Sequence, residues 1–131
     1  MTEPKRVIFV CVENSNRSQM AEAFARIYGR GQVEAHSAGS RPSGQVNQRA
    51  VAVMREIGYD LSQQRSKGLT EIPDVDYDFA ITMGCGDQCP LVRAKQREDW
   101  QIPDPTDLPA EQFRVVRDLI KAKVQELLAS L

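Results

Sequence analysis

The chain has 131 residues and a formal net charge of -1, with 17 Lys and Arg against 18 Asp and Glu. This length fits a single domain of residues 1–131, and 41% hydrophobic residues can form a core without disulfide or metal staples. The near-neutral charge disfavours nucleic acid or a membrane surface as a partner, and no apolar run is long enough to span a bilayer. Because the three cysteines cannot all pair within one chain and no secretion signal is recognisable, we expect a reducing, cytoplasmic location.

Short apolar runs alternate with helix-like patterns along the first half of the chain. Residues 5–10 are apolar, β-branched and aromatic, which is typical of a buried parallel strand. Apolar residues recur at helical spacing over 18–28 and stop at a glycine, so we expect a helix there. A second strand is expected over 33–35, and a helix capped by Asn47 is expected to end at Gly58.

The second half continues this alternation. Residues 78–83 predict another buried strand, and residues 100–102 predict a brief final one. The basic cluster within 93–97 is interpreted as a solvated face. A long amphipathic helix is expected to begin at Pro109 or Ala110. The order predicts an α/β domain, an open parallel four-stranded sheet with helices on both faces, in which ligands bind at the carboxyl ends of the strands.

The loop after the first strand begins with a cysteine, and an arginine follows six residues later where a helix begins. Loop N–H groups and the helix dipole can form a socket for a tetrahedral oxyanion, to which Arg17 adds a planar fork. The same positive environment favours a nucleophilic thiolate at Cys11, whose sulfur can accept a hydrogen bond from Ser18. The alternative is a buried structural cysteine beside a surface arginine. The expected oxyanion-binding residues are Val12, Glu13, Asn14, Ser15, Asn16, Arg17 and Ser18.

Residues 11–23, CVENSNRSQMAEA, resemble the signature of the low-molecular-weight protein tyrosine phosphatases and of the arsenate reductases built on that fold, particularly the reductase version. The resemblance continues through residues 37–39 (SAG), 82–90 (TMGCGDQCP) and 100–105, and so covers nearly the whole chain. It implies a phosphatase-like fold with an anion-binding P-loop. It also implies reduction of arsenate to arsenite in arsenic detoxification.

Two positions distinguish the branches of this family. The phosphatases usually carry a second cysteine beside the loop arginine and tyrosines after their Asp-Pro pair. This chain carries Asn16 at the first position and Thr106-Asp107 at the second. Both departures favour the reductase.

Asp104 is the candidate general acid. An oxygen that leaves a tetrahedral oxyanion needs a proton from a carboxylic acid placed opposite the nucleophile. Proline on both sides of Asp104 stiffens its loop, and the Asp-Pro pair matches the family. The alternatives are an ordinary aspartate in a proline-rich turn and Asp107 as the acid.

Cys85 and Cys89 are the candidate redox cysteines. Three residues separate them, and Gly84 and Gly86 allow the loop to bring the two sulfurs to disulfide distance. The main alternative is two unrelated free cysteines. A single Cys-x3-Cys and a lone His36 offer too few clustered ligands for zinc, so we expect no metal and no cofactor.

The resemblance implies a relay of these three cysteines. Cys11 displaces an oxygen from arsenate with Asp104 as general acid, and Cys85 then attacks Cys11 and releases arsenite. Cys89 attacks Cys85 in turn, which leaves a Cys85–Cys89 disulfide for an external reductant. Thioredoxin is the reductant for well-known relatives whose later cysteines are further apart, whereas the short spacing here is also similar to relatives served by low-molecular-weight thiols. The expected reductant is thioredoxin or a system of glutaredoxin and a low-molecular-weight thiol. The order of attack and the reductant therefore stay open.

Two other functions fit the same residues. A phosphatase acting on phosphotyrosine or small phosphoesters needs only Cys11, Arg17 and Asp104. An oxyanion-binding redox sensor would use the loop and the cysteines without turnover.

A cation site occurs in some family members, and Glu22 and Ser37 match two of its positions. The third position is acidic in those members, but this chain has Lys67 there. Because lysine places positive charge where the site needs negative charge, we expect no potassium dependence.

Overall fold

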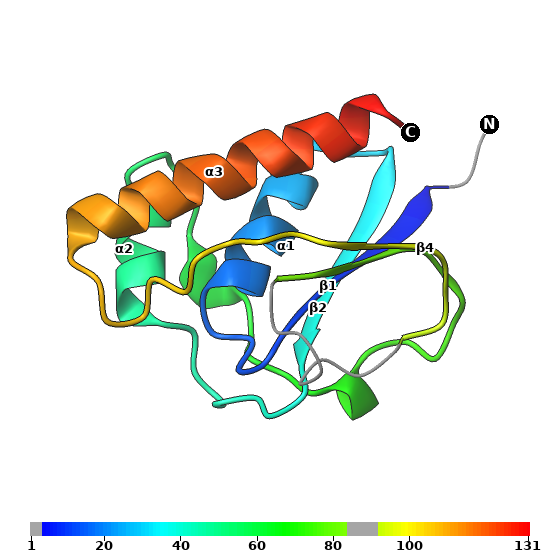
Figure 1. Cartoon of the computed structure of the whole chain (residues 1–131), viewed down its shortest axis with the longest axis horizontal. Helices are drawn as coiled ribbons and strands as arrows, with labels where there is room; N and C mark the ends of the chain where they lie inside the picture. Colours follow the sequence, from blue (N-terminus) through cyan, green and yellow to red (C-terminus); the bar gives the residue numbers. More distant parts are fainter. Residues whose placement is uncertain (1–3, 84–91) are drawn as a thin grey trace.

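The computed structural model describes residues 4–83 and 92–131 (Figure 1). Its four strands run parallel in one sheet of spatial order β2-β1-β3-β4. The strands are β1 (Lys5–Cys11), β2 (Val33–Gly39), β3 (Tyr77–Thr82) and β4 (Ala94–Asp99). The described helices are α1 (Arg17–Tyr28), α2 (Gln48–Arg55) and α3 (Ala110–Ala129), with the 3-10 helices η1 (Leu61–Gln63) and η2 (Leu69–Glu71). The predicted α/β fold with a parallel four-stranded sheet is confirmed.

The fourth strand lies earlier in the chain than expected. Residues 100–102 do not form it; β4 occupies Ala94–Asp99 and pairs with β3 alone, at the edge of the sheet. Its sequence, AKQRED, is polar because most of these side chains are exposed, and charge on an edge strand discourages pairing with other chains. The prediction was wrong here because an exposed edge strand lacks the apolar pattern by which buried strands are recognised.

Alternate residues of β1 enter two separate cores on opposite faces of the sheet. Val7, Phe9 and Cys11 join the larger core, which includes buried residues of all three α-helices. Ile8 and Val10 join the smaller core on the other face. We expected helices on both faces, and the described helix that packs on the smaller core is the short η2, through its Leu69.

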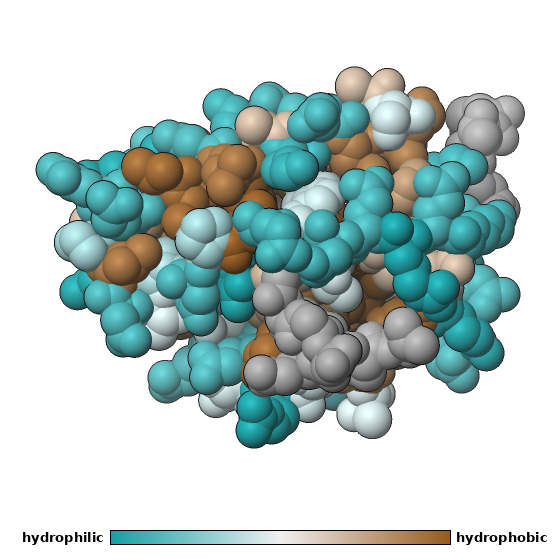
Figure 2. Space-filling model, viewed as in Figure 1, coloured by the Kyte–Doolittle hydropathy of each residue, from teal (hydrophilic) through white to brown (hydrophobic). Residues whose placement is uncertain are grey.

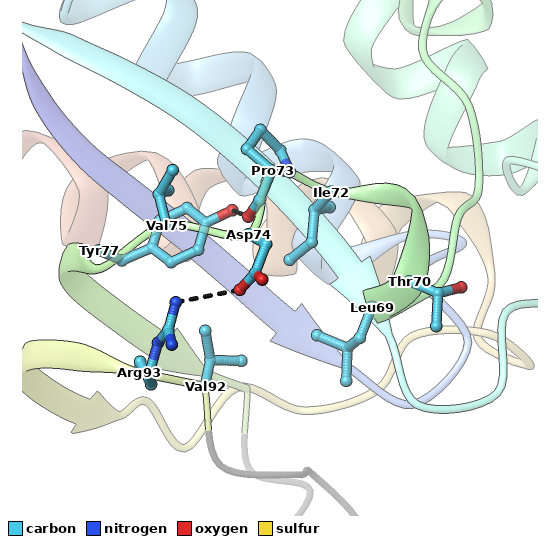
Figure 3. A pocket seen from close by; sticks show the side chains of 9 residues that line it. All are labelled: Leu69, Thr70, Ile72, Pro73, Asp74, Val75, Tyr77, Val92 and Arg93. Atoms are coloured by element: carbon cyan, nitrogen blue, oxygen red, sulfur yellow. Dashed lines mark hydrogen bonds and ion pairs between the residues drawn. The ribbon is translucent and has the colours of Figure 1, made fainter.

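A hollow of about 540 Å³ lies beside this smaller core (Figure 3). Its wall is mostly apolar, and an ion pair of 3.0 Å between Arg93 and Asp74 closes one side. Neither Cys11 nor Arg17 lines it. The expected chemistry therefore lies elsewhere, at the carboxyl end of β1.

The outer surface is mostly polar on the face shown in Figure 2. Hydrophobic side chains gather there over the first half of α3, the half that carries the exposed Val115 and Leu119. In the described parts of the chain, no helix combines the length and apolar character needed to cross a membrane.

Candidate functional site

The loop of residues 12–16 connects the end of β1 to the start of α1. β1 is a central strand, with β2 on one side and β3 on the other. The chain passes from β1 to β2 in one direction and later returns to the opposite side of β1 to form β3. Such a reversal opens a crevice at the carboxyl ends of the strands, where open α/β sheets bind their ligands.

Among the described residues, the carbonyl groups of this loop accept hydrogen bonds, whereas its backbone N–H groups have no acceptor. The carbonyl oxygens of Val12, Glu13 and Ser15 accept hydrogen bonds of 2.8–3.0 Å from backbone N–H groups within residues 41–47. The N–H groups of residues 12–16 donate to none of the described residues. Since buried N–H groups in proteins nearly always find an acceptor, these donors are suited to an anionic ligand.

Asn14 holds the loop in its shape from within. Its backbone has a φ of 51°, a left-handed conformation that asparagine tolerates better than most residues, and its side chain is fully buried. Oδ1 accepts a 2.9 Å hydrogen bond from the N–H of Lys67, and Nδ2 donates to the Ser18 hydroxyl at 2.7 Å. Gly39 makes room beside it, because a Cβ there would lie 2.5 Å from the carbonyl oxygen of Val12.

Cys11 is the last residue of β1, directly before this loop, and 3% of it is exposed. Its Sγ is 2.8 Å from the hydroxyl oxygen of Ser18. That oxygen already accepts a hydrogen bond from Asn14, so its own proton is free to point at the sulfur. A donor in this position stabilises a thiolate, the nucleophilic form of cysteine.

Arg17 is anchored along one edge and open along the other. One terminal nitrogen, Nη1, donates to the backbone carbonyls of Met83 and Ile102, at 2.6 and 3.0 Å. The Nε atom is buried and has no hydrogen-bond partner among the described residues. Nε and Nη2 form the edge with which arginine binds two oxygens of one oxyanion, so the anchoring presents this edge ready for a ligand.

Asp104 is the carboxylate that the structure places beside Arg17. Its Oδ2 lies 3.8 Å from Nη2, and about half of its side chain is exposed. Partial burial raises the pKa of Asp104, but hydrogen bonds from Thr106, the charge of Arg17 and the amide of Asn16 together hold it below its usual value. Asp107, the alternative acid, is exposed and has no such contact with Arg17 in the described structure.

The ammonium group of Lys67 contacts Glu22 and Ser37, the two residues that match positions of the cation site expected from the resemblance. Its Nζ lies 3.3 Å from Glu22 Oε1, 3.3 Å from the Ser37 hydroxyl and 3.2 Å from the carbonyl oxygen of Arg65. Glu22 is 2% exposed and also accepts hydrogen bonds from Ser37 and Arg26. The positive charge of Lys67 thus neutralises the buried carboxylate of Glu22.

The structure brings together the expected residues of the loop, Cys11, Arg17 and Asp104. Cys85 and Cys89 lie outside the described residues. His36 pairs with Glu34 at 2.9 Å on β2, away from the loop, as a structural histidine does. Sequence reasoning missed the hydrogen bond between Asn16 and Thr106, although both residues had been singled out as departures from the phosphatases.

In the described structure a hydrogen-bonded cysteine is followed by a loop whose N–H groups have no acceptor and by an arginine whose Nε has none. Phosphatase-like enzymes use these groups to hold a tetrahedral oxyanion for attack by sulfur. The fold and the site therefore define this class. A family model described as low molecular weight phosphotyrosine protein phosphatase matches residues 6–131. The chain belongs to this family.

Similar proteins within the family are arsenate reductases. The chain is 42% identical over 130 residues to a glutaredoxin arsenate reductase from Synechocystis sp., which covers 97% of this chain and 98% of the relative. A solved arsenate reductase in a phosphate-binding state is 42% identical and has a TM-score of 0.86 over 96% of this chain and 98% of that one. A thioredoxin-dependent arsenate reductase from Corynebacterium glutamicum is 30% identical, with a TM-score of 0.78 over 98% of this chain and 62% of that chain.

Proposed function

We propose that this chain reduces arsenate to arsenite and so takes part in arsenic detoxification. The observation that carries the proposal is the buried Nε of Arg17, which has no partner in the described structure and lies at the end of the loop that starts at the Cys11 nucleophile, a combination suited to a tetrahedral oxyanion. Phosphate and arsenate share this shape and charge. The three cysteines and the 42% identity to a glutaredoxin arsenate reductase favour arsenate.

The first step forms a bond between sulfur and arsenic. The Cys11 thiolate attacks the arsenic atom while the loop N–H groups and Arg17 hold the other oxygens. Asp104 gives a proton to the oxygen that leaves, which departs as water with the electron pair of the broken arsenic–oxygen bond. The product is a thiol–arsenate adduct on Cys11.

The second step moves two electrons from thiols to arsenic. The thiolate of Cys85 attacks the Cys11 sulfur, and arsenic leaves with the electron pair of the arsenic–sulfur bond as arsenite. Cys89 then attacks Cys85 and frees Cys11, so the oxidation resides in a Cys85–Cys89 disulfide. If Cys89 attacks Cys11 first and Cys85 attacks Cys89 second, the same two electrons reach arsenic and the same disulfide forms.

An external thiol reductant completes the cycle. We expect glutaredoxin with a low-molecular-weight thiol, because the glutaredoxin arsenate reductase is 42% identical and the thioredoxin-dependent one is 30% identical. If thioredoxin reduces the enzyme more efficiently than glutaredoxin does, the choice of glutaredoxin is wrong, but the proposal of arsenate reduction is unaffected. The need to regenerate thiols fits a reducing, cytoplasmic location.

Arsenate-dependent oxidation of the reductant tests the proposal, with wild type compared against Cys85→Ser and Cys89→Ser. We expect both variants to lose reduction and to keep hydrolysis of an aryl phosphate, which needs attack by Cys11 and then attack by water on the phosphorylated Cys11, but neither Cys85 nor Cys89. Reduction at the wild-type rate in both variants would refute the relay.

A phosphatase that acts on phosphotyrosine or small phosphoesters is the second candidate. The family and the geometry of Cys11, Arg17 and Asp104 favour it, because these three groups also suffice for phosphoester hydrolysis. Rapid aryl phosphate hydrolysis by a wild type that does not reduce arsenate would establish it. Absence of both reactions would favour an oxyanion-binding redox sensor.

A further inference from the structure

Asn16 and Thr106 join the loop over Cys11 to the segment that carries Asp104. The amide Nδ2 of Asn16 donates a 2.9 Å hydrogen bond to the Thr106 hydroxyl oxygen, across 90 residues of sequence. The Thr106 hydroxyl in turn lies 2.6 Å from Oδ1 of Asp104. These are also the two positions at which the chain departs from the usual phosphatase pattern.

The direction of each hydrogen bond in this chain is fixed. Oδ1 of Asn16 accepts from the backbone N–H of Arg17, so the other side of the amide, its NH2 group, must face Thr106. The Thr106 oxygen accepts from that NH2 group and therefore has its own proton to donate to Asp104. The donors all point from the loop toward the carboxyl group.

The two oxygens of Asp104 consequently have different surroundings. Oδ1 accepts from both the hydroxyl and the backbone N–H of Thr106, at 2.6 and 3.1 Å. Oδ2 has no such donor within hydrogen-bond distance in the described structure and faces Nη2 of Arg17 at 3.8 Å. A proton on Oδ1 would have to displace at least one of these two donors, whereas a proton on Oδ2 displaces none.

We propose that Asn16 and Thr106 are a positioning pair that reserves Oδ1 of Asp104 as an acceptor, so that the proton for the leaving oxygen is carried on Oδ2, toward Arg17. This inference rests on the proposed function, in which Asp104 is the general acid. In the first step the Oδ2–H bond breaks, the proton goes to the oxygen leaving arsenic, and Asp104 remains ionised with Oδ1 still held by Thr106. Solvent returns the proton, because half of the Asp104 side chain is exposed.

Asn16 and Thr106 also affect the pH range over which Asp104 is protonated and can act as an acid. Arg17 is the charged group that the described structure places against Asp104; Thr106 donates to Asp104, and Asn16 donates to Thr106. All three favour the ionised carboxylate. Loss of the Thr106 hydroxyl should therefore shift the alkaline limb of the pH profile of kcat to higher pH. It should also leave the carboxyl group of Asp104 free to rotate, so that its proton is no longer held toward Arg17.

The test compares Thr106→Val with Thr106→Ser in steady-state reduction of arsenate, with Thr70→Val as a control because Thr70 is an exposed threonine on η2. We expect Thr106→Val to lower kcat about tenfold with KM for arsenate within about twofold, and to raise the pH of the alkaline limb. Thr106→Ser keeps the hydroxyl and should restore kcat and the limb to near wild type. Wild-type kcat in Thr106→Val, or an equal loss in Thr106→Ser, would overturn the inference.

A double-variant cycle with Asn16→Ala separates a connected pair from two independent contacts. If Asn16 acts through Thr106, the double variant should lose no more kcat than Thr106→Val alone, and fully additive losses would refute the pair. Thermal unfolding of each variant is the control that each protein is folded under the conditions in which kcat is measured. A wild type that does not reduce arsenate overturns the proposed function, whereas the comparison among variants overturns the positioning pair.

Discussion

The Cys11 sulfur lies 2.8 Å from the hydroxyl oxygen of Ser18, and Asn14 orients that hydroxyl by donating to it from the other side. The nucleophile is thus oriented by one residue of the loop, Asn14, and one residue of the first turn of α1, Ser18. Each of the three residues is buried, so water does not replace a missing hydrogen bond freely.

Replacing Ser18 with alanine should slow the attack of Cys11. A hydrogen bond to a charged group contributes about 1.5–3 kcal/mol, so kcat/KM for arsenate should fall roughly tenfold to a hundredfold. Steady-state kinetics measures the loss. Ser130→Ala, at an exposed serine after α3, is the control and should match wild type.

Replacing Arg17 with lysine should remove binding of two oxygens at once. Lysine has one ammonium group and cannot hold the carbonyls of Met83 and Ile102 while presenting a fork to the ligand. We expect kcat/KM to fall by about a hundredfold or more and competitive inhibition by phosphate to weaken. Arg30→Lys, at an exposed position, should change neither; an unaltered phosphate inhibition constant in Arg17→Lys would count against the anion site.

Lys67→Met should destabilise the fold because Glu22 would keep a buried charge with one partner fewer. Removing one partner of a buried charge costs on the order of 1–3 kcal/mol in free energy of unfolding, which urea denaturation measures. Lys95→Met, which removes an exposed lysine from its pair with the partly exposed Asp78, should cost about 1 kcal/mol or less. Equal losses in the two variants would contradict the role given to Lys67.

Potassium provides a second measurement on the same lysine. In wild type the Lys67 ammonium fills the space among Glu22, Ser37 and the Arg65 carbonyl, so replacing sodium with potassium should leave activity and stability unchanged. In Lys67→Met, a free cation can approach Glu22 and should recover part of the lost stability. A large gain of wild-type activity in potassium would contradict this assignment.

Stability should fall at alkaline pH because of Tyr77. Burial raises the pKa of Tyr77 to about 12, and its hydroxyl donates to the Pro73 carbonyl at 2.9 Å. Since the folded-state pKa exceeds the unfolded value of 10.0, this contribution is complete below about pH 10 and is lost as the pH rises toward about 12. Urea midpoints across this range should fall less steeply in Tyr77→Phe than in wild type.

The control for this experiment is Tyr28→Phe, because Tyr28 is 42% exposed. It should keep the wild-type slope of stability against pH. Burial also raises the pKa of Tyr59, so some slope should remain in Tyr77→Phe. A Tyr77→Phe slope equal to that of wild type would refute the assignment.

The sequence predicted those parts of the molecule whose determinants are local. β1 is buried on both faces over residues 7–11, which form a continuous apolar run, and β3 carries a shorter apolar run over 79–81, whereas β4 is an exposed edge strand with no such signal. The loop from Cys11 to Ser18 could be recognised because its chemistry is contiguous in sequence. Lys67 was placed near Glu22 by resemblance, and the structure adds the distances.

The contact between Asn16 and Thr106 could not be predicted in the same way. It depends on how the segment before α3 packs against the start of α1, and neither residue has a periodic or compositional signal of that contact. The same holds for the anchoring of Arg17, whose acceptors are backbone carbonyls of Met83 and Ile102. Backbone acceptors carry no residue type that a sequence pattern could reveal.

A single turnover without external reductant tests the cysteine relay most directly. Fully reduced protein would be mixed with arsenate, and arsenite and free thiols would be counted per chain. The relay predicts one arsenite per chain and loss of two of the three thiols, because one disulfide supplies the two electrons. Cys85→Ser and Cys89→Ser identify the cysteines involved. Absence of arsenite in wild type, with all three thiols still free, would contradict the relay.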